Sequence, residues 1–396
     1  MTTPPNSHRI LFVVSSLRGG GAEFVARTWM GWLAQRGHRV SVVITAGTAD
    51  LDFLPPGVRT KTLGAAHGHL EKCVALSRVV RSEQPDVAIA LQTHPNLLLL
   101  AAASLLPPAR RPQIFISERN LVSLGLPGSS PSHRLKIAAA KILYRFSDHA
   151  LAISHPVAAE LVSAFGISGE KVTVVANPAT AKVDLGRAIR TIRVPTPDRV
   201  QLVLACRLVE QKRPLLAVAT AVELQRRGVA TRIVSFGAGP LQDQLAHEAE
   251  RAGIVCDFRG WVEDWFAEVD SDAVTLLPSL REGFGNVLVE AAAAGYPSVA
   301  VSGALGVADA IVPGITGEFA LSADPRDLAD AVQRAATLSL SGVDPWLARF
   351  SAQSSGSDLE RVIEKALSTS GLGSVSTATS PNSGTPDRAT PDRAAP

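Results

Sequence analysis

The sequence LLPSLREGFGNVLVEAAAAGYP occupies residues 276–297, and its character changes twice within that length. Its apolar start, closed by Pro278, is typical of the end of a buried strand. Residues 282–285 then form a turn with two glycines, and residues 286–294 are rich in helix formers. A strand that leads through a glycine turn into a helix directs free backbone N–H groups and a positive dipole end at one place. That place suits a phosphate or a sugar oxygen.

Two carboxylates belong to this stretch. Glu282 lies in the turn and Glu290 lies eight residues later, about two turns into the predicted helix. At the carboxyl edge of a parallel sheet both side chains could face one cleft. An ordinary strand–turn–helix connection with a solvated glutamate at each end would show the same pattern. The stretch therefore predicts α/β architecture and a candidate ligand site.

The whole chain predicts two domains, because 396 residues exceed what one hydrophobic core usually holds. An apolar content of 46% with only 5% aromatic residues fits an α/β protein. The charge is divided unevenly: residues 1–190 contain 21 Lys and Arg against 11 Asp and Glu, whereas residues 191–396 contain 18 against 25. We therefore expect the N-terminal half to favour anionic partners.

Cysteine spacing and hydropathy exclude several classes of protein. Cys73, Cys206 and Cys256 show no paired spacing and no histidine cluster, so neither a disulfide framework nor a zinc site is predicted. Residues 1–8 lack the pattern of a signal peptide. The longest apolar run, residues 97–106, is about half of what a membrane span needs. We expect a cytoplasmic protein, and peripheral contact with a membrane stays open.

The N-terminal half alternates strands and helices as a parallel sheet requires. A strand at residues 8–15 leads into a glycine-rich loop and a helix to about residue 35. In this loop Gly20 and Gly21 would let the backbone approach a ligand at the start of the helix. The order Gly-Gly-Gly-Ala-Glu does not match the G-x-G-x-x-G dinucleotide motif. A merely flexible turn would have the same composition.

Two further candidates follow predicted strands. His94 comes after the strand at residues 86–91, and Glu118 comes after the strand at residues 113–117. The carboxyl ends of parallel strands are where α/β proteins form ligand sites. A lone histidine at the start of a loop is more often structural, so both interpretations of His94 stay open.

Residues 132–147 predict a basic helix. Leu135, Ala138 and Leu143 fall on one side of it. It carries no acid, and its four cations are Arg134, Lys136, Lys141 and Arg145. Such a helix suits a membrane surface or an anionic acceptor, and it equally suits a surface helix packed on its domain.

A charged, proline-bearing segment separates this half from a second series of strands and helices that begins near residue 200. Arg207 and Lys212 then place two cations in a strand-to-helix loop, where a forked and a point charge suit a diphosphate. The later Gly237-Ala238-Gly239-Pro240 is not a dinucleotide motif, because Gln242 occupies the place of its third glycine.

The order and spacing of these features over about residues 8–370 resemble retaining glycosyltransferase family 4. Glu282 and Glu290 with the turn between them resemble the E-x7-E element of that family, in which the first glutamate contacts the donor sugar and the second holds the ribose. Arg207 and Lys212 resemble the pair that binds the diphosphate and offsets the leaving-group charge. The resemblance thus implies catalytic roles for Arg207, Lys212 and Glu282. The donor-binding residues that it implies are Gly20, Gly21, Gly237, Gly239, Val262, Gly283, Phe284, Gly285, Asn286 and Glu290.

The resemblance also implies the GT-B fold, which consists of two Rossmann-like βαβ domains facing across a cleft. An acceptor-binding domain would comprise residues 1–178 with the return of a C-terminal helix at 355–368. A linker at 179–198 would lead to a nucleotide-sugar-binding domain at 199–354. Residues 369–396 are Ser-, Thr-, Gly- and Pro-rich with a doubled Thr-Pro-Asp-Arg-Ala, which predicts a disordered tail.

The implied reaction is metal-independent transfer of a sugar with retention of configuration, because cations and helix N-termini would replace a divalent metal. No cofactor and no nucleic-acid partner are expected. Glu118, Arg119 and Asn120 stand where many relatives carry a His, and Asn177-Pro178 replaces a commoner Asn-Gly. Both departures resemble the branch that acts on polyprenyl-diphosphate-linked glycans.

His94, Glu118, Arg119 and Asn120 are therefore candidates to contact the acceptor or the donor sugar. The expected donor is a UDP-linked hexose or N-acetylhexosamine, and the expected acceptor is a lipid-linked or envelope glycan. A soluble acceptor and a non-catalytic sugar-nucleotide-binding protein are the alternatives.

Overall fold

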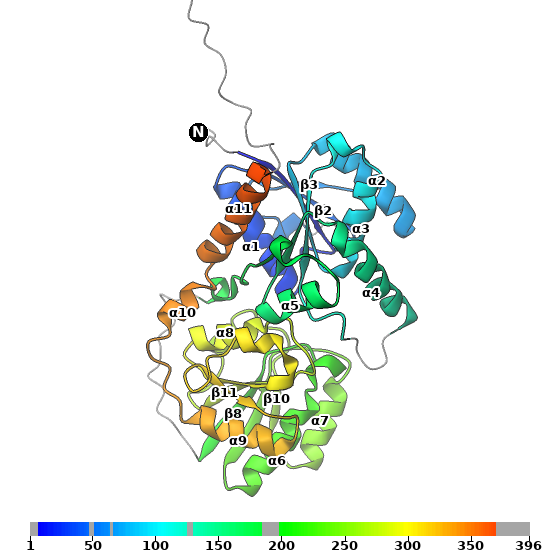
Figure 1. Cartoon of the computed structure of the whole chain (residues 1–396). Coiled ribbons are helices and arrows are strands. Elements are labelled where there is room, and N and C mark those ends of the chain that lie inside the picture. Colours follow the sequence, from blue (N-terminus) through cyan, green and yellow to red (C-terminus); the bar gives the residue numbers. More distant parts are fainter. Residues whose placement is uncertain (1–6, 47–50, 64–65, 125–129, 184–197, 370–396) are drawn as a thin grey trace, which may run out of the picture.

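The structure, a computed structural model, describes residues 7–46, 51–63, 66–124, 130–183 and 198–369. It contains two parallel sheets, each built from one half of the chain, and Figure 1 shows them as two bodies stacked end to end. Most of the predicted linker and nearly all of the predicted tail lie outside the described residues.

The first sheet has seven strands in the order β3-β2-β1-β4-β5-β6-β7, all parallel. Its strands are β1 Arg9–Val14, β2 Arg39–Ile44, β3 Arg59–Lys61, β4 Val87–Leu91, β5 Gln113–Glu118, β6 His149–Ala152 and β7 Val172–Val174. The helices between them are α1 Gly21–Gln35, α2 Gly68–Glu83, α3 Thr93–Ser104, α4 Pro131–Leu143 and α5 His155–Ser163. The central strands are apolar at nearly every position and buried on both faces, as helices on both sides of a parallel sheet require.

The second sheet has six parallel strands in the order β10-β9-β8-β11-β12-β13. Its strands are β8 Arg199–Leu204, β9 Ala230–Ser235, β10 Cys256–Phe258, β11 Ala273–Leu277, β12 Ser298–Val301 and β13 Gly317–Ala320. Its helices are α6 Leu215–Arg226, α7 Gln242–Arg251, α8 Asn286–Ala293 and α9 Pro325–Ala336. The sequence did not predict the edge strand β13, because this short segment follows a glycine-rich turn and shows no clear alternation of apolar and polar residues.

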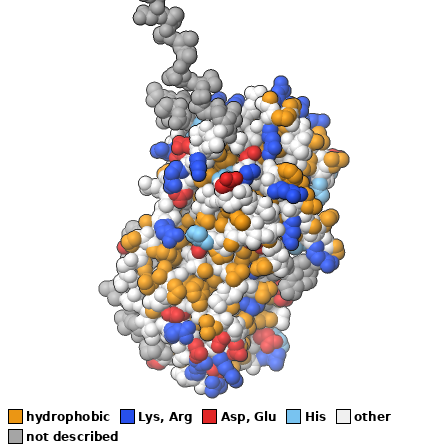
Figure 2. Space-filling view, in the orientation of Figure 1, with side chains coloured by type: hydrophobic (Ala, Val, Ile, Leu, Met, Phe, Trp, Pro, Cys, Tyr) orange, Lys and Arg blue, Asp and Glu red, His pale blue; other side chains and the backbone are white. Residues whose placement is uncertain are grey.

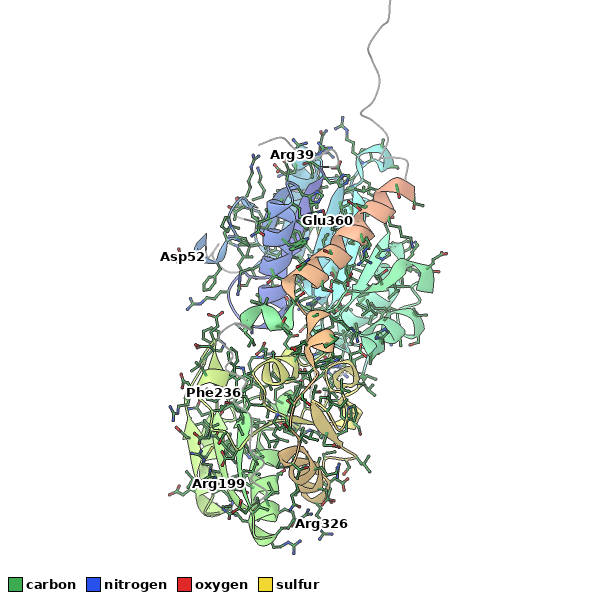
Figure 3. All side chains as sticks on the ribbon, turned by 90° about the vertical axis from the view of Figure 1, so that its left-hand side faces the viewer. Arg39, Asp52, Arg199, Phe236, Arg326 and Glu360 are labelled. Atoms are coloured by element: carbon green, nitrogen blue, oxygen red, sulfur yellow. The ribbon has the colours of Figure 1, made fainter. Side chains whose placement is uncertain are left out.

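The last helices lead the chain back to the first sheet. After α10 Asp344–Ala348, helix α11 Ala352–Thr369 lies along α1, as both Figure 1 and Figure 3 show. The buried Trp29 indole donates to Ser355 Oγ at 2.8 Å. Glu360, labelled in Figure 3, accepts from His38 Nε2 at 3.1 Å. The last helix of the described chain therefore packs on the part of the molecule that the first half of the chain builds.

One local prediction was wrong. Helix α3 begins at Thr93 rather than at residue 97, so His94 belongs to its first turn and not to a loop. Pro95 does not block this start, because the first turn of a helix has N–H groups without helical partners. The burial of α4, which the sequence left open, is decided by the structure: 71% of the Leu135 surface is exposed, and the helix buries Ile137 and Ala140.

The packing of α11 on α1 leads to a prediction about stability. A Cβ added to Gly356 would lie 2.3 Å from Trp32 Cγ. Alanine improves helix propensity by about 1 kcal/mol, but overpacking typically costs about 1–3 kcal/mol, and this overlap belongs at the upper end. We expect Gly356→Ala to lower the free energy of unfolding in urea. Gln353→Ala, an exposed change on the same helix, should stay within about 0.5 kcal/mol.

Candidate active site

A cavity of about 710 Å³ lies between the carboxyl edges of the two sheets. Its walls come from the segments that follow β1, β4 and β5 on one side and β8, β9 and β11 on the other. The volume is that of a site for a small ligand. Because parallel strands end at the same edge, each half of the chain presents its connecting loops to the other.

Most of the residues singled out in the sequence meet in this cavity. From the first half, Gly20, Gly21, Glu118, Arg119 and Asn120 line it. From the second half, its lining includes Arg207, Lys212, Gly237, Val262, Glu282, Phe284, Gly285, Asn286 and Glu290. His94, Gly239 and Gly283 do not belong to the lining.

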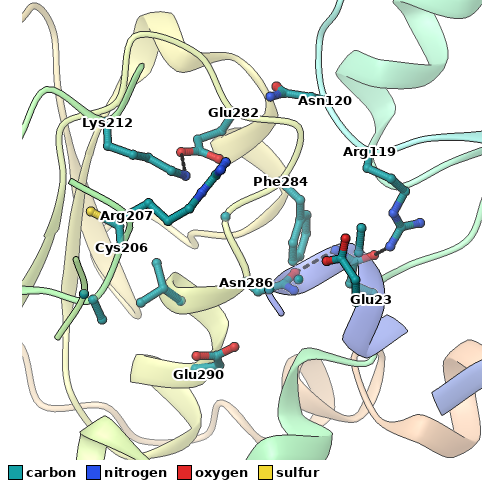
Figure 4. Close-up of a pocket in the computed structure, with 18 of the residues that line it drawn as sticks. Glu23, Arg119, Asn120, Cys206, Arg207, Lys212, Glu282, Phe284, Asn286 and Glu290 are labelled. Atoms are coloured by element: carbon teal, nitrogen blue, oxygen red, sulfur yellow. Dashed lines mark hydrogen bonds and ion pairs between the residues drawn. The ribbon is translucent and has the colours of Figure 1, made fainter. Parts of the chain in front are cut away.

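The first carboxylate of the opening stretch lies among cations. Lys212 Nζ forms an ion pair with Glu282 Oε1, and the Ser279 hydroxyl donates to the same oxygen at 2.6 Å. Arg207 converges on this pair in Figure 4. Burial raises the pKa of the neighbouring Cys206 thiol to about 11, so this thiol is neutral at physiological pH. The cluster can place two positive charges beside an anionic group of a ligand.

Gly283 is needed for the close packing of two backbone segments at this site. A Cβ on Gly283 would lie 2.5 Å from the Arg119 carbonyl oxygen, so only glycine lets the two backbones approach so closely. Its own carbonyl accepts from Ser154 Oγ at 2.6 Å. Gly239 is comparable, since a Cβ there would lie 2.3 Å from the Leu208 carbonyl oxygen. Both glycines therefore lie behind the residues that line the cavity, where they allow two backbone segments to pack closely.

The second carboxylate is held from both halves of the chain. Glu290 Oε1 pairs with Lys182 Nζ at 3.2 Å, and Glu290 Oε2 accepts from the Trp265 indole at 3.1 Å. Lys182 also lies 5.0 Å from the ring centroid of Phe24 on α1. Sequence reasoning missed Lys182 and Trp265: Lys182 lies in the segment predicted as linker, and neither residue belongs to a motif.

Glu118 is the last residue of β5 and is almost fully buried. Burial raises its pKa to about 7, although a hydrogen bond from the Tyr144 hydroxyl acts in the opposite direction. Asn96 Nδ2 donates to the same carboxylate at 3.2 Å. Near neutral pH this group can therefore either donate or accept a proton. Tyr144 and Asn96 had no sequence signal, because they belong to two separate helical segments.

A polar chain crosses from one half of the site to the other. Arg119 donates to Asn177 Oδ1, and Asn177 Nδ2 donates to Asn286 Oδ1 at 2.7 Å. Burial lowers the pKa of Arg119 to about 9, and its guanidinium lies 5.3 Å from the centroid of a Trp29 ring. Asn286 is the first residue of α8, so this chain ties the end of β5 to the helix that carries Glu290. Figure 4 shows Arg119 and Asn286 among the residues that line the cavity.

His94 lies beside the cavity rather than in its lining. Its ring is 5.2 Å from that of His69 on α2, in an edge-to-face arrangement. In the part of the chain that the structure describes, no three His, Cys, Asp or Glu side chains are grouped to hold a metal ion.

Two family models match the two halves of the chain. The model described as Glycosyltransferase Family 4 matches residues 19–181, and the model described as Glycosyl transferases group 1 matches residues 199–337. Together the matches include the lining segments from both sheets, with Arg207, Lys212, Glu282 and Glu290 in the second.

Curated relatives are similar at moderate identity. A glycogen synthase of Mycobacterium tuberculosis is 29% identical over 277 residues, which are 68% of this chain and 64% of that protein. A D-inositol 3-phosphate glycosyltransferase 2 of Catenulispora acidiphila is 29% identical over 52% of each chain. A GDP-mannose-dependent alpha-(1-6)-phosphatidylinositol dimannoside mannosyltransferase of M. tuberculosis is 27% identical over 75% of this chain and 79% of that protein. The chain thus spans less than two thirds of the length of the first two of these relatives.

Solved structures show the same fold. The lipopolysaccharide outer core galactosyltransferase WaaB superposes with a TM-score of 0.71 at 19% identity, over 90% of this chain and 99% of WaaB. Anabaena Alr3699/HepE in complex with UDP superposes with a TM-score of 0.68 at 18% identity, over 90% of this chain and 100% of that protein. The two Rossmann-like sheets facing across a cavity are therefore the GT-B fold, as the sequence predicts.

The raised pKa of Glu118 predicts how stability depends on pH. The folded state binds this proton more tightly than the unfolded chain, whose glutamate pKa is about 4.5, so the free energy of unfolding should fall as pH rises from about 4.5 to about 7. The slope from one group is at most about 1.4 kcal/mol per pH unit.

Glu118→Gln keeps the shape of the protonated acid and should reduce this dependence. Urea unfolding of both proteins at about pH 5 and about pH 7.5 measures the difference. Equal changes in wild type and variant would show that Glu118 ionises normally.

Proposed function

The chain belongs to the glycosyltransferase family 4 superfamily, and we propose from that premise that it transfers a sugar from a nucleotide sugar with retention of anomeric configuration. The observation that carries the proposal is the meeting of Arg207, Lys212, Glu282 and Glu290 in one cavity. Two cations and two positioned carboxylates match the needs of a diphosphate leaving group with a sugar on one side and a ribose on the other.

On the donor side, Arg207 and Lys212 stabilise the negative charge that develops on the diphosphate as the glycosidic bond breaks. This electrostatic task needs no divalent metal, so we propose metal-independent transfer. Glu282 lies beside Lys212 and would accept hydrogen bonds from hydroxyl groups of the donor sugar. Glu290 already accepts from Lys182 and Trp265, and a carboxylate has about four acceptor sites, so two remain for the ribose hydroxyls.

The donor is proposed to be a UDP-linked hexose or N-acetylhexosamine. Solved structures with the same fold are complexes with UDP and with UDP-glucose, which supports a uridine donor. The mannosyltransferase relative is named for GDP-mannose, so the assay below includes GDP-sugars. Val262 lies in the cavity lining, where its backbone would contact the base.

The acceptor is proposed to be a lipid-linked or envelope glycan, reached at an anionic membrane surface through α4. The outward face of α4 carries Leu135 and Ile142, whose surfaces are 71% and 56% exposed. Phe146, just beyond the helix, is 57% exposed. The exposed cations around them are Arg134, Lys141 and Arg145. Apolar side chains at helical spacing with basic neighbours are the pattern of a helix that lies in a membrane interface.

Other observations bear on this surface. Figure 2 shows hydrophobic side chains exposed among Lys and Arg side chains on the upper body. None of the helices in the described ranges has both the length and the apolar character to cross a bilayer. The name of the mannosyltransferase relative includes phosphatidylinositol dimannoside, which is a lipid. The exposed side chains and the name of that relative support the proposed contact with a membrane surface.

A soluble acceptor is the second candidate, and the relatives named for D-inositol 3-phosphate favour it. Transfer to a water-soluble acceptor without lipid or detergent would distinguish it. A non-catalytic sugar-nucleotide-binding protein is the third. Release of free nucleoside diphosphate from a panel of UDP- and GDP-sugars would exclude it.

The same assay tests the donor site. We expect Lys212→Ala and Glu290→Ala each to lower turnover by about 10²-fold or more, the size of effect known for one preorganised electrostatic group. Lys365→Ala, an exposed change on α11, is the matched control and should keep full turnover. Full activity in either site variant, with the fold intact by circular dichroism, would refute the assignment.

The membrane surface has its own test. Replacing Arg134, Lys141 and Arg145 with Gln should weaken co-sedimentation with phosphatidylglycerol-containing vesicles, because each cation near the surface contributes about 1 kcal/mol. The matched control replaces Arg226, Arg251 and Arg259, which lie on the second half of the chain and are also largely exposed. Unchanged co-sedimentation of the α4 variant would remove the membrane proposal and leave the transferase proposal intact.

A further inference from the structure

The short segment that follows β7 reaches from the first half of the chain to α8 of the second half. It includes Asn177 and the 3₁₀ turn Ala179–Lys182, and this turn packs on α8. Asn177 Nδ2 donates to Asn286 Oδ1 at 2.7 Å. Lys182 Nζ pairs with Glu290 Oε1 at 3.2 Å. Asn286 and Glu290 are four residues apart, so the segment contacts one face of α8 at two points.

The two oxygens of the Glu290 carboxylate have partners from different halves of the chain. Oε1 pairs with Lys182, and Oε2 accepts from the Trp265 indole at 3.1 Å. Trp265 is itself held in place, because its ring packs against those of Phe236 and Phe266, with centroids 6.1 Å and 5.8 Å away. A carboxylate oxygen has about two acceptor sites, so these contacts leave one on each oxygen. Two neighbouring hydroxyl groups, such as those of a ribose, require that arrangement.

Lys182 is held on a second side by an aromatic ring. Its Nζ lies 5.0 Å from the ring centroid of Phe24 on α1, within the range of a cation–π contact. The side chain of Lys182 is 19% exposed and that of Glu290 is 6% exposed. An ion pair from which water is largely excluded interacts more strongly than one on the surface.

The pair also lies where a ligand would meet it. Lys182, Trp265 and Glu290 all belong to the lining of the cavity, and Figure 4 shows Glu290 with Asn286 among the side chains there. A buried carboxylate that loses its cation turns toward another partner or takes up a proton. Lys182 therefore controls both the direction and the charge of the Glu290 carboxylate.

We propose that Lys182 is a positioning residue of the donor site, which holds the Glu290 carboxylate in the orientation that accepts the ribose hydroxyls of the nucleotide. The inference rests on the proposed transferase function, which it deepens: recognition of the ribose requires a side chain from each half of the chain. The start of the segment with a linker composition is thereby part of the donor site. Lys182 acts through Glu290 and not by contact with the diphosphate.

Titration of the full chain with UDP and with GDP, followed by calorimetry, tests this inference without an acceptor. Lys182→Met keeps an unbranched side chain and removes its charge. We expect it to weaken the nucleotide that wild type binds at least about tenfold, because the charge-assisted contact that orients Glu290 is lost. Lys182→Arg should restore most of the affinity. Lys365→Met, an exposed change on α11, is the matched control and should bind like wild type.

Nucleotides without ribose hydroxyls show whether Lys182 acts through Glu290. The 2′,3′-dideoxy form of the same nucleotide should bind wild type and Lys182→Met equally. In a double-mutant cycle, Lys182→Met added to Glu290→Gln should cost little further affinity for the ribose form. Equal losses for the two forms, as a general disturbance of the fold or a contact with the diphosphate would produce, would overturn the positioning role. Additive losses in the cycle would overturn it as well.

Further outcomes separate this inference from the proposed function. Failure of wild type to bind UDP or GDP would refute the nucleotide-sugar donor and the role of Lys182 with it. Wild-type binding that Lys182→Met retains in full would overturn the role of Lys182 alone. With a donor that wild type uses, Lys182→Met should raise KM at least about tenfold and lower kcat less than Lys212→Ala does. A fall in kcat as large as that of Lys212→Ala would place Lys182 at the leaving group and overturn the inference.

Discussion

The contact on which the site depends is the close approach of two backbones. The turn after β11 lies against the segment that follows β5, so closely that Gly283 has no room for a Cβ beside the Arg119 carbonyl. Ser154 holds the Gly283 carbonyl from the same side. Because this contact joins the carboxyl edges of the two sheets, it decides which loops face one another. The hydrogen bonds from Arg119 through Asn177 to Asn286 extend it across the cavity.

Charge is distributed over this framework in pairs. Each of the two glutamates of the opening stretch has a lysine partner, Lys212 for Glu282 and Lys182 for Glu290, and the second of these comes from the other half of the chain. Carboxylates held in this way are suited to position a ligand through accepted hydrogen bonds. Glu118 differs, because burial leaves its pKa close to neutrality. The two sides of the cavity thus have different chemistry: the turn after β11 and helix α8 contribute paired carboxylates, and the end of β5 contributes a titratable carboxyl group.

Sequence reasoning succeeded where local pattern controls structure. Apolar runs bounded by glycine and proline predicted most strands of both sheets, and glycine turns marked the loops at their carboxyl ends. It could not decide burial: the side of the basic helix that carries Leu135 could have been packed or exposed, and the structure exposes Leu135. His94 was predicted to lie at the start of a loop, but α3 begins at Thr93, since a first helical turn tolerates a proline such as Pro95. Lys182 lay in a segment whose composition is typical of a linker.

The sequence by itself determined the two successive βαβ series, the family resemblance, and the cationic pair with its two glutamates, because these depend on residues close together in the chain. Only the tertiary structure decided what each charged group touches. Trp265 lies 25 residues from Glu290, and Lys182 lies more than a hundred residues from it. The residue that contacts a charged group, and the burial that shifts the pKa of Glu118, depend on tertiary packing. Local sequence pattern does not contain that information.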